Sequence, residues 1–484
     1  MTRVLVIGGG PGGLAAARSA RLAGADVTLI EASDSLGGQF WRHLPDSRPA
    51  ANERMLHHGW HRFQSLVAEL MADDGCEIVT EAHVWAIDAG ARPVVHAVIG
   101  EADGSGRTRT TFQPDAIVLA TGAFDRTLPF PGWDLPGVFT AGAAQALAKG
   151  ERVAVGQRVL VAGAGPFLLP VAQSLAATGS RVVAVMEANR AVPLLRGWLP
   201  RPWQLLPAAG KGLELAGYLA GHLRHRIPYL LGRTVIAAHG TDRVESVTTA
   251  KLDRDWVPIA GTEKTIEVDA VCVSHSFTPR LELALAAGCA LTPERFVRVD
   301  ARQQTTVAGV YAVGELTGIG GVDLALAEGE IAGRSAAGAS GTNAALERRK
   351  TVFTRFAARI EAAHGIRRGW PAWLTESTIV CRCEEVSYGS LWSTARATQS
   401  ESLRSLKLST RAGLGICQGR ICGRTVEDLL ARQTEGERLT DGTVSDRRPI
   451  AVPIRLGELA TPPDHQPHTE PPNRSLSGSA KGTQ

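Results

Sequence analysis

VLVIGGGPGGLAA, residues 4–16, leads from a short apolar strand through a glycine loop into an alanine-rich helix. Gly8, Gly10 and Gly13 stand in G-x-G-x-x-G spacing, and a second strand that follows leads to Glu31. Gly8 permits a tight turn, Gly10 lets the backbone approach a pyrophosphate, and Gly13 lets helix and strand pack closely. The free N–H groups at the helix start attract an anion, and Glu31 can accept hydrogen bonds from ribose hydroxyls. The segment therefore predicts a β-α-β unit that binds a dinucleotide.

A second β-α-β unit repeats this pattern with one change. Its loop, VLVAGAGPFLLP over 159–170, keeps Gly163 and Gly165 but has Leu168 where a third glycine would allow close packing. Glu187 follows at the end of the next strand, where a carboxylate could bind a ribose. The unit is therefore either a site for NAD(H) or a retained fold without a cofactor. We favour the second reading, because a bulky Leu168 pushes helix and strand apart.

The composition narrows the class of protein. The chain has 484 residues, of which 44% are hydrophobic and 21% charged, so we expect about three globular units. A formal net charge of +4 is too small to favour nucleic acid as a partner, and seven cysteines do not make a disulfide framework. The first ten residues lack the apolar segment of a secretory signal, and no run of about 20 apolar residues predicts a membrane span. We therefore expect a cytoplasmic protein with reduced thiols.

Two further segments favour FAD over NAD at the first loop. IVLATG, residues 117–122, is an apolar strand ending in Ala-Thr-Gly, and VYAVGE, residues 310–315, is a strand running into a glycine turn. With the first loop, these segments resemble the two-dinucleotide-fold flavoproteins of the pyridine nucleotide-disulfide oxidoreductase class. In that class an acid at the position of Glu315, usually aspartate, binds the ribityl chain of the flavin.

The resemblance implies a set of FAD contacts but not the reaction after which the class is named. The implied contacts are Gly8, Gly10, Pro11, Gly12, Gly13, Glu31, Gly38, Gln39, Thr121, Gly122, Gly314 and Glu315. After Gly37 and Gly38 the sequence reads QFWRH, without a Cys-x-x-x-x-Cys pair, and the second unit has no Cys-x-x-Cys pair. Because disulfide reduction needs such a dithiol, we exclude it.

Four cysteines near the C-terminus form the other candidate site. Cys381 and Cys383 precede Cys417 and Cys422, and the second pair lies in GLGICQGRICG, residues 413–423. Structural zinc usually uses Cys-x(2–4)-Cys pairs, for which Cys-x-Cys is tight, whereas flanking glycines offer N–H groups to cluster sulfur. Spacing therefore favours a 2Fe–2S cluster, with zinc or free thiols as the other readings.

Charge gives a second indication for a cluster. Residues 346–432 contain thirteen Arg and two Lys against seven Glu and one Asp, a net charge of +7, which leaves −3 for the rest of the chain. Four of these arginines, Arg382, Arg411, Arg420 and Arg424, are near the cysteines in sequence and could favour the reduced, more negative cluster.

The cysteine region resembles the bacterioferritin-associated ferredoxin-like 2Fe–2S domain, whose CxC…GxGxCQGRxC pattern it matches with all four metal ligands. Together with FPGWDLPGV (130–138) and TAGAAQ (140–145), it makes nearly the whole chain resemble the alpha subunits of opine oxidases and related heteromeric amino acid dehydrogenases, a group that includes hydrogen cyanide synthase and D-hydroxyproline dehydrogenase. The resemblance implies an α/β fold with two Rossmann-like folds and a small helical 2Fe–2S domain.

The same resemblance implies an FAD-dependent oxidoreductase that passes electrons between flavin and cluster within a hetero-oligomer. An amino-acid-oxidase-like FAD beta subunit would oxidise the carbon–nitrogen bond, and a small ferredoxin-like subunit could complete the assembly. Two other readings stay open: a stand-alone NAD(P)H-dependent reductase, which Leu168 disfavours, and a non-catalytic nucleotide-binding scaffold. No acid–base residue is predicted here, and we read His275, in VSHSFTPR, as structural.

We expect four parts along the chain. They are an FAD-binding domain over 1–122 and 300–345, a second nucleotide-binding-like domain over 123–299, a 2Fe–2S domain over 346–434 and a tail over 435–484 that is largely disordered after 461. A Leu-, Trp- and Pro-rich helical insertion over 190–235 interrupts the second domain. This insertion, with Trp198 and Trp203, is a candidate docking surface for the beta subunit.

Overall fold

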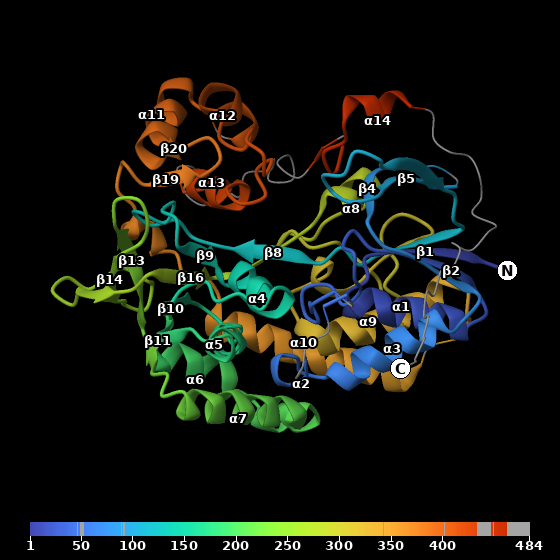
Figure 1. Cartoon of the computed structure of the whole chain (residues 1–484), viewed down its shortest axis with the longest axis horizontal. Helices are drawn as coiled ribbons and strands as arrows, with labels where there is room; N and C mark the ends of the chain where they lie inside the picture. Colours follow the sequence, from blue (N-terminus) through green and yellow to red (C-terminus); the bar gives the residue numbers. More distant parts are fainter. Residues whose placement is uncertain are drawn as a thin grey trace, which may run out of the picture.

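The computed structural model describes residues 1–45, 47–48, 53–88, 90, 92–341, 343–400, 402–432, 447–448 and 450–461. Figure 1 shows the N-terminal sheet and its helices on one side and the second sheet on the other. Helices α11 (Tyr388–Thr398), α12 (Leu403–Thr410) and α13 (Gly423–Leu430) lie above strand β8 (Ala123–Arg126), which runs between the two halves. The tail predicted to be disordered after 461 lies outside the described residues.

The N-terminal sheet is parallel, with strand order β18-β7-β1-β2-β3. Its strands are β1 (Arg3–Ile7), β2 (Asp26–Ile30), β3 (Cys76–Val79), β7 (Ala116–Leu119) and β18 (Val310–Ala312). Apart from Arg3, the central strands β1 and β7 are apolar and buried, because both faces of the sheet are covered. Since β1 lies between β2 and β7, the glycine loop that follows it opens at the carboxyl edge of the sheet, where α/β proteins bind nucleotides.

Helices α1 (Pro11–Leu22), α3 (Trp60–Met71) and α9 (Gly321–Ala336) cover one face of this sheet. α1 begins at Pro11, within the glycine loop, because proline suits the first turn of a helix. α1 and α9 approach closely: a Cβ added at Gly329 would lie 2.2 Å from the carbonyl oxygen of Gly12. The other face packs against an antiparallel sheet of β4 (Ala82–Asp88), β5 (Val94–Ile99) and β6 (Thr108–Phe112), and against α8 (Glu282–Ala286). The short α2 (Glu53–Leu56) precedes α3.

The second sheet repeats the same architecture with strand order β12-β11-β10-β16-β9. Its strands are β9 (Val138–Thr140), β10 (Arg158–Gly163), β11 (Arg181–Glu187), β12 (Tyr229–Leu231) and β16 (Ala270–Ser274). Helices α4 (Ala141–Gly150) and α5 (Leu168–Ala177) pack on one face, and the antiparallel strands β13 (Arg233–His239), β14 (Ser246–Lys251) and β15 (Lys264–Glu267) pack on the other. The predicted α/β fold with two Rossmann-like units is therefore confirmed.

A two-stranded antiparallel ribbon of β8 (Ala123–Arg126) and β17 (Ser276–Pro279) joins the two halves. β18 ends at Ala312 and is followed by the 3₁₀ turn η2 (Gly314–Leu316), so the strand predicted to reach Glu315 is shorter. The turn starts at Gly314 with φ of +70°, a backbone conformation that ends a strand and favours glycine.

The predicted helical insertion consists of α6 (Ala191–Trp198), η1 (Pro202–Ala208) and α7 (Ala209–Arg224). The long helix α10 (Ala344–His364) packs against α6 and α9, so residue 346, the predicted start of the last domain, falls within a helix that contacts both nucleotide folds. A Cβ added at Gly197 would lie 2.5 Å from the Ala363 backbone, which fixes α6 closely against the end of α10.

The cysteine-bearing region is small and mostly helical, as predicted. It comprises η3 (Trp370–Trp373), β19 (Ile379–Cys381), β20 (Val386–Ser387), α11 (Tyr388–Thr398), α12 (Leu403–Thr410) and α13 (Gly423–Leu430). Beyond it, α14 (Leu456–Ala460) is held to β6 and its flanking loop by Arg107, which donates to Glu458 at 2.7 Å. In the part of the chain that is described, no helix is long and apolar enough to cross a membrane.

Candidate functional site

The first glycine loop has the shape that its sequence predicts. Gly8 has φ of +111°, and a Cβ added there would lie 2.4 Å from the carbonyl oxygen of Ala120. A Cβ at Gly13 would lie 1.8 Å from the carbonyl oxygen of Gly8. Gly10 differs from both, because its φ is −74° and the nearest atom to an added Cβ is the Cα of Gly38, 3.9 Å away. Gly8 and Gly13 are thus required by the fold, whereas Gly10 leaves open space in front of the N-terminus of α1.

Glu31 lies beside this loop at the end of β2. Its carboxylate accepts hydrogen bonds from the backbone N–H of Gly9 at 2.6 Å and of Ser33 at 2.9 Å, and from the Ser33 hydroxyl at 3.0 Å. These donors fix the carboxylate at the carboxyl edge of the sheet, where a dinucleotide ribose would reach it.

One cavity of about 2450 Å³ collects the predicted flavin residues. All of them except Gly13 line it; Gly13 lies behind the loop, where its role is close packing. The cavity runs from the first glycine loop past Thr121 and Gly122 to Gly314 and Glu315, and on to the second glycine loop. A space that is open along this path can hold an extended dinucleotide, so the residues fit FAD.

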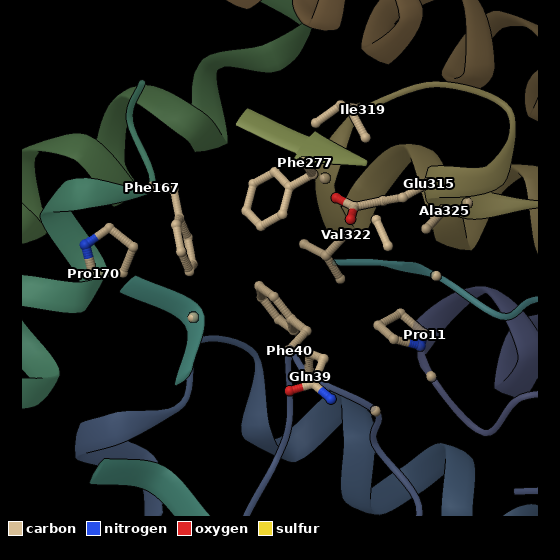
Figure 2. A pocket seen from close by; sticks show the side chains of 18 of the residues that line it. Pro11, Gln39, Phe40, Phe167, Pro170, Phe277, Glu315, Ile319, Val322 and Ala325 are labelled. Atoms are coloured by element: carbon tan, nitrogen blue, oxygen red, sulfur yellow. The ribbon is translucent and has the colours of Figure 1, made fainter. Parts of the chain in front are cut away.

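The middle of the cavity has an aromatic wall that was not predicted. Figure 2 shows the rings of Phe40, Phe167 and Phe277 directed into one space, with the carboxylate of Glu315 beside Phe277. Phe167 and Phe277 meet edge to face with ring centroids 5.1 Å apart. Flat apolar surfaces of this kind suit a planar ring system. The signal in the sequence is weak, because each phenylalanine comes from a different segment.

The turn that carries Glu315 is held from behind by a buried carboxyl group. Glu328 accepts hydrogen bonds from the backbone N–H of Gly314 and from the hydroxyl of Thr317, both at 2.8 Å. Burial raises the pKa of Glu328 to about 7, and burial raises the pKa of Glu315 to about 7 as well. No motif in the sequence points to Glu328, which lies inside α9.

The raised pKa of Glu328 leads to a prediction for the Glu328→Gln variant. The folded-state pKa lies above the ordinary value of 4.5, so the stability linked to this proton is complete below about pH 4.5 and is lost as the pH rises through about 7. One carboxyl shifted this far accounts for at most about 3 kcal/mol. Denaturant unfolding at about pH 5 and about pH 8 should show that the variant loses less stability than the wild type over this range. Equal pH dependence of the two proteins would contradict the assignment.

The second glycine loop does not offer a free ribose-binding acid. The Glu187 side chain is fully buried, and its carboxylate accepts hydrogen bonds from the backbone N–H of Gly165 and of Asn189, both at 2.9 Å. The Nδ1 atom of His364, at the end of α10, lies 3.0 Å from the same carboxylate. The suggested role of Glu187 in binding NAD(H) is therefore not supported, because, unlike Glu31, Glu187 does not line the cavity and His364 lies against its carboxylate.

The four cysteines come together as two thiol pairs. Cys381 contacts Cys422, and Cys383 contacts Cys417, with electrostatic interaction between the pairs. The hydrogen bond with the Cys422 thiol lowers the pKa of Cys381 to about 6, while the pKa of Cys422 is raised by the same contact. The backbone N–H of Gly413 also points to the Cys381 sulfur at 3.5 Å.

The loop geometry around these thiols fits a cluster. A Cβ added at Gly415 would lie 2.3 Å from the Cβ of Cys383, and Gly413 and Gly419 have φ of +85° and +79°. Glycines therefore let the loop fold tightly around the sulfurs. Within the described ranges, no group of three or more His, Cys, Asp or Glu side chains converges as a site for one metal ion. Two thiol pairs are the donor set that a two-iron cluster needs.

Ion pairs link the cysteine-bearing region to strand β8 and to residues in and after α8. α13, which starts directly after Cys422, contributes Glu427 and Asp428, which pair with Arg295 and Arg126. Arg420 donates to Glu282 at 2.6 Å. Arg411, in contrast, pairs with Glu384 at 2.6 Å within the cysteine-bearing region and stays exposed.

Arg420 connects the cysteine loop with the cavity. Its guanidinium lies 3.4 Å from the carbonyl oxygen of Cys417, and both Arg420 and Ile421 line the cavity that holds the flavin residues. Arg280 and Arg420 lie over the Phe124 ring, with distances of 4.1 and 6.0 Å to its centroid. The two predicted cofactor sites are therefore adjacent.

His275 has the structural role that we expected. It is buried, its Nδ1 accepts a hydrogen bond from the backbone N–H of Leu128 at 3.3 Å, and its ring packs against those of Trp256 and Trp373. Burial lowers its pKa to about 3, so it stays neutral at physiological pH.

Two glycine loops on parallel sheets, a cavity along the predicted flavin residues and an adjacent four-cysteine loop define an oxidoreductase with flavin and iron–sulfur centres. Residues 2–341 match the pyridine nucleotide-disulphide oxidoreductase family, and residues 379–432 match the BFD-like [2Fe-2S] binding domain. The chain belongs to the pyridine nucleotide-disulphide oxidoreductase family. It is an FAD-dependent electron-transfer oxidoreductase with a 2Fe–2S cluster, as predicted, and the zinc and free-thiol readings are set aside.

The chain is similar over nearly its full length to components of multi-subunit enzymes. It is 32% identical to an opine oxidase subunit from Agrobacterium tumefaciens, covering 98% of this chain and 94% of that one. It is 30% identical to the HcnB subunit of hydrogen cyanide synthase from Pseudomonas protegens, covering 96% and 98%. The crystal structure of L-proline dehydrogenase from P. horikoshii shares the fold, with a TM-score of 0.66 and 21% identity over 95% of this chain and 79% of that one.

Proposed function

We propose that this chain is the electron-transfer subunit of a heteromeric amino acid or opine dehydrogenase. A partner flavoprotein, similar to amino acid oxidases, oxidises the amine to an imine and releases two electrons, which this chain receives. The observation that carries the proposal is the shared cavity: Arg420 and Ile421 of the cysteine loop and the predicted flavin residues line the same space. The names of the relatives, which are subunits of an opine oxidase and of a hydrogen cyanide synthase, supply the class of substrate.

FAD and the 2Fe–2S cluster are bound by two separate sets of residues. FAD is held by Gly8, Gly10, Pro11, Gly12, Gly13, Glu31, Gly38, Gln39, Thr121, Gly122, Gly314 and Glu315, and the 2Fe–2S cluster by Cys381, Cys383, Cys417 and Cys422. When bound, a flavin takes up two electrons and can release them singly, whereas a 2Fe–2S cluster carries one. The ion pairs of α13 and Arg420 keep the two sites at a fixed separation.

The second nucleotide fold supports this role over that of an NAD(P)H-dependent reductase. The carboxylate of Glu187 accepts hydrogen bonds from the backbone N–H groups of Gly165 and Asn189 and lies against His364. Leu168, which replaces the third glycine of the loop, is buried at the start of α5. The fold therefore serves as a wall of the cavity, to which it contributes Phe167.

Co-purification followed by dye reduction tests the proposed function. The chain is expected to assemble with a flavoprotein partner, and the complex should reduce an artificial dye when an opine, hydroxyproline or glycine is supplied. The isolated chain should not do so. Dye reduction by the isolated chain with an amine would contradict the division of labour, as would a failure to assemble with any flavoprotein.

A further inference from the structure

The insertion helix α7 presents its apolar side chains to solvent. Leu213 and Leu223 are 78% and 79% exposed, although a leucine in a surface helix ordinarily faces the core. Together with their neighbours they form what we call the α6–α7 face, made of exposed apolar residues from three consecutive elements: Val192, Leu195, Leu199, Trp203, Leu206, Leu213, Leu215, Leu219 and Leu223. Exposed apolar surface of this extent marks an interaction site.

The inner side of α7 is polar, which explains why the leucines face outward. Lys211 lies 2.7 Å from Glu214 and 2.9 Å from Asp323 of α9, and the hydroxyl of Tyr218 donates to Glu214 at 3.1 Å. These contacts fix the rotation of the helix about its axis. The normal amphipathic arrangement is thus inverted, and the described part of the chain leaves the α6–α7 face exposed.

The exposed charged side chains of the insertion itself, residues 190–226, all have one sign. Arg190, Arg196, Arg201, Arg224 and Arg226 are exposed. The only acidic residue between 190 and 226 is Glu214, whose carboxylate is used on the inner side. A partner that matches this rim therefore carries carboxylates around an apolar centre.

The α6–α7 face also borders the flavin cavity. Leu206 and Leu219 of this face, with Pro202 beside them, line the same cavity as Gly10 and Glu315. In Figure 1, α7 lies along the edge of the molecule farthest from α11 and α12, so a partner bound there leaves the cysteine-bearing region uncovered. A protein that docks on this face would close the cavity on the side opposite the cluster.

We propose that the α6–α7 face is the docking surface for the amine-oxidising flavoprotein subunit, an inference that rests on the proposed function. A flavoprotein partner with an apolar surface surrounded by carboxylates would cover the exposed apolar residues and pair with the arginines. It would also lie beside the cavity to which it passes electrons. A second copy of this chain would bring two arginine rims together, which costs electrostatic energy. A membrane surface would close the cavity against lipid, where no electron donor reaches it.

The test uses the full chain with both cofactors and the partner flavoprotein recovered by co-purification. Trp203→Glu/Leu223→Glu changes two exposed residues that do not line the cavity. We expect the double variant to bind the partner about 100-fold more weakly, because buried aromatic and aliphatic anchors dominate interfaces. Its FAD and 2Fe–2S absorption should equal those of the wild type. Leu22→Glu on α1 and Leu408→Glu on α12 change equally exposed leucines elsewhere and should leave affinity unchanged.

Charge reversal adds an independent measurement. Arg196→Glu/Arg224→Glu should slow association about tenfold at low salt and remove most of its salt dependence, since rim charges steer encounter. Amide exchange of α7 should slow in the complex.

The outcomes separate this inference from the proposed function. If the complex forms and the Trp203/Leu223 variant binds as tightly as the wild type, the docking surface is refuted while the proposed function stands. If no flavoprotein assembles with the chain, the proposed function fails. If the isolated chain is a dimer that the variant dissociates, or binds phosphatidylglycerol vesicles that the variant does not bind, the face has another occupant and the inference is wrong.

Discussion

Cys417→Ser should remove the 2Fe–2S absorption and the bound iron while FAD remains at its wild-type content. Cys417 pairs with Cys383 in the cysteine loop, and a serine hydroxyl is a poor substitute for a thiolate ligand of iron. The residue belongs to a loop that follows α12, and no FAD contact that we assign lies in that loop. The iron content should fall about tenfold or more, because even indirect ligand support changes metal affinity by this amount.

Iron and acid-labile sulfide analysis, together with visible absorption before and after denaturing release of the flavin, measure the two cofactors separately. Cys76→Ser on β3 is the matched control, since Cys76 is half-buried and lies in the N-terminal sheet. A wild-type chain that contains zinc and no iron would refute the assignment of the four cysteines. So would a Cys417→Ser variant with its full complement of iron.

Gly10→Val should abolish FAD binding without disturbing the fold. An added side chain at Gly10 meets open space within the protein and needs no unusual backbone conformation. The same side chain projects where the pyrophosphate would approach the N-terminus of α1. FAD affinity is expected to fall at least about 100-fold, the effect of losing more than about 2.7 kcal/mol of binding free energy.

Two other glycines make the result interpretable. Gly106→Val, in an exposed loop with no atom near the added side chain, should change neither FAD binding nor stability. Gly13→Val should prevent folding of the N-terminal domain, because its Cβ alone would overlap the Gly8 backbone. FAD titration followed by fluorescence, with circular dichroism as a check of folding, distinguishes the three variants. Wild-type FAD affinity in Gly10→Val would show that the flavin does not bind at this loop.

The sequence predicts those parts of the site that are formed by residues close together in the chain. Gly8 and Gly13 are recognisable because no other residue fits the turn and the packing behind it, and the four cysteines because their spacing restricts the metal. The second strand, predicted to lead to Glu31, is present as β2, which ends one residue before that acid.

What depends on residues far apart in the chain could not be predicted. The carboxylate of Glu187 lies 3.0 Å from the Nδ1 atom of His364, 177 positions away in the sequence. A residue that could bind a ribose therefore makes a contact within the protein instead. The aromatic wall combines Phe40, Phe167 and Phe277 from three separate segments. The outward leucines of α7 follow from the contact of Lys211 with Asp323 of α9, which no local pattern reveals.

Anaerobic reduction of the purified complex tests the central claim most directly. The amine substrate should bleach the flavin absorption and produce the electron paramagnetic resonance signal of a reduced 2Fe–2S cluster in this chain, whereas NADH should do neither in the isolated chain. Rapid bleaching of the isolated chain by NADH, or an amine-reduced complex whose cluster stays oxidised, would contradict the account of this protein as an electron-transfer subunit fed by an amine-oxidising partner.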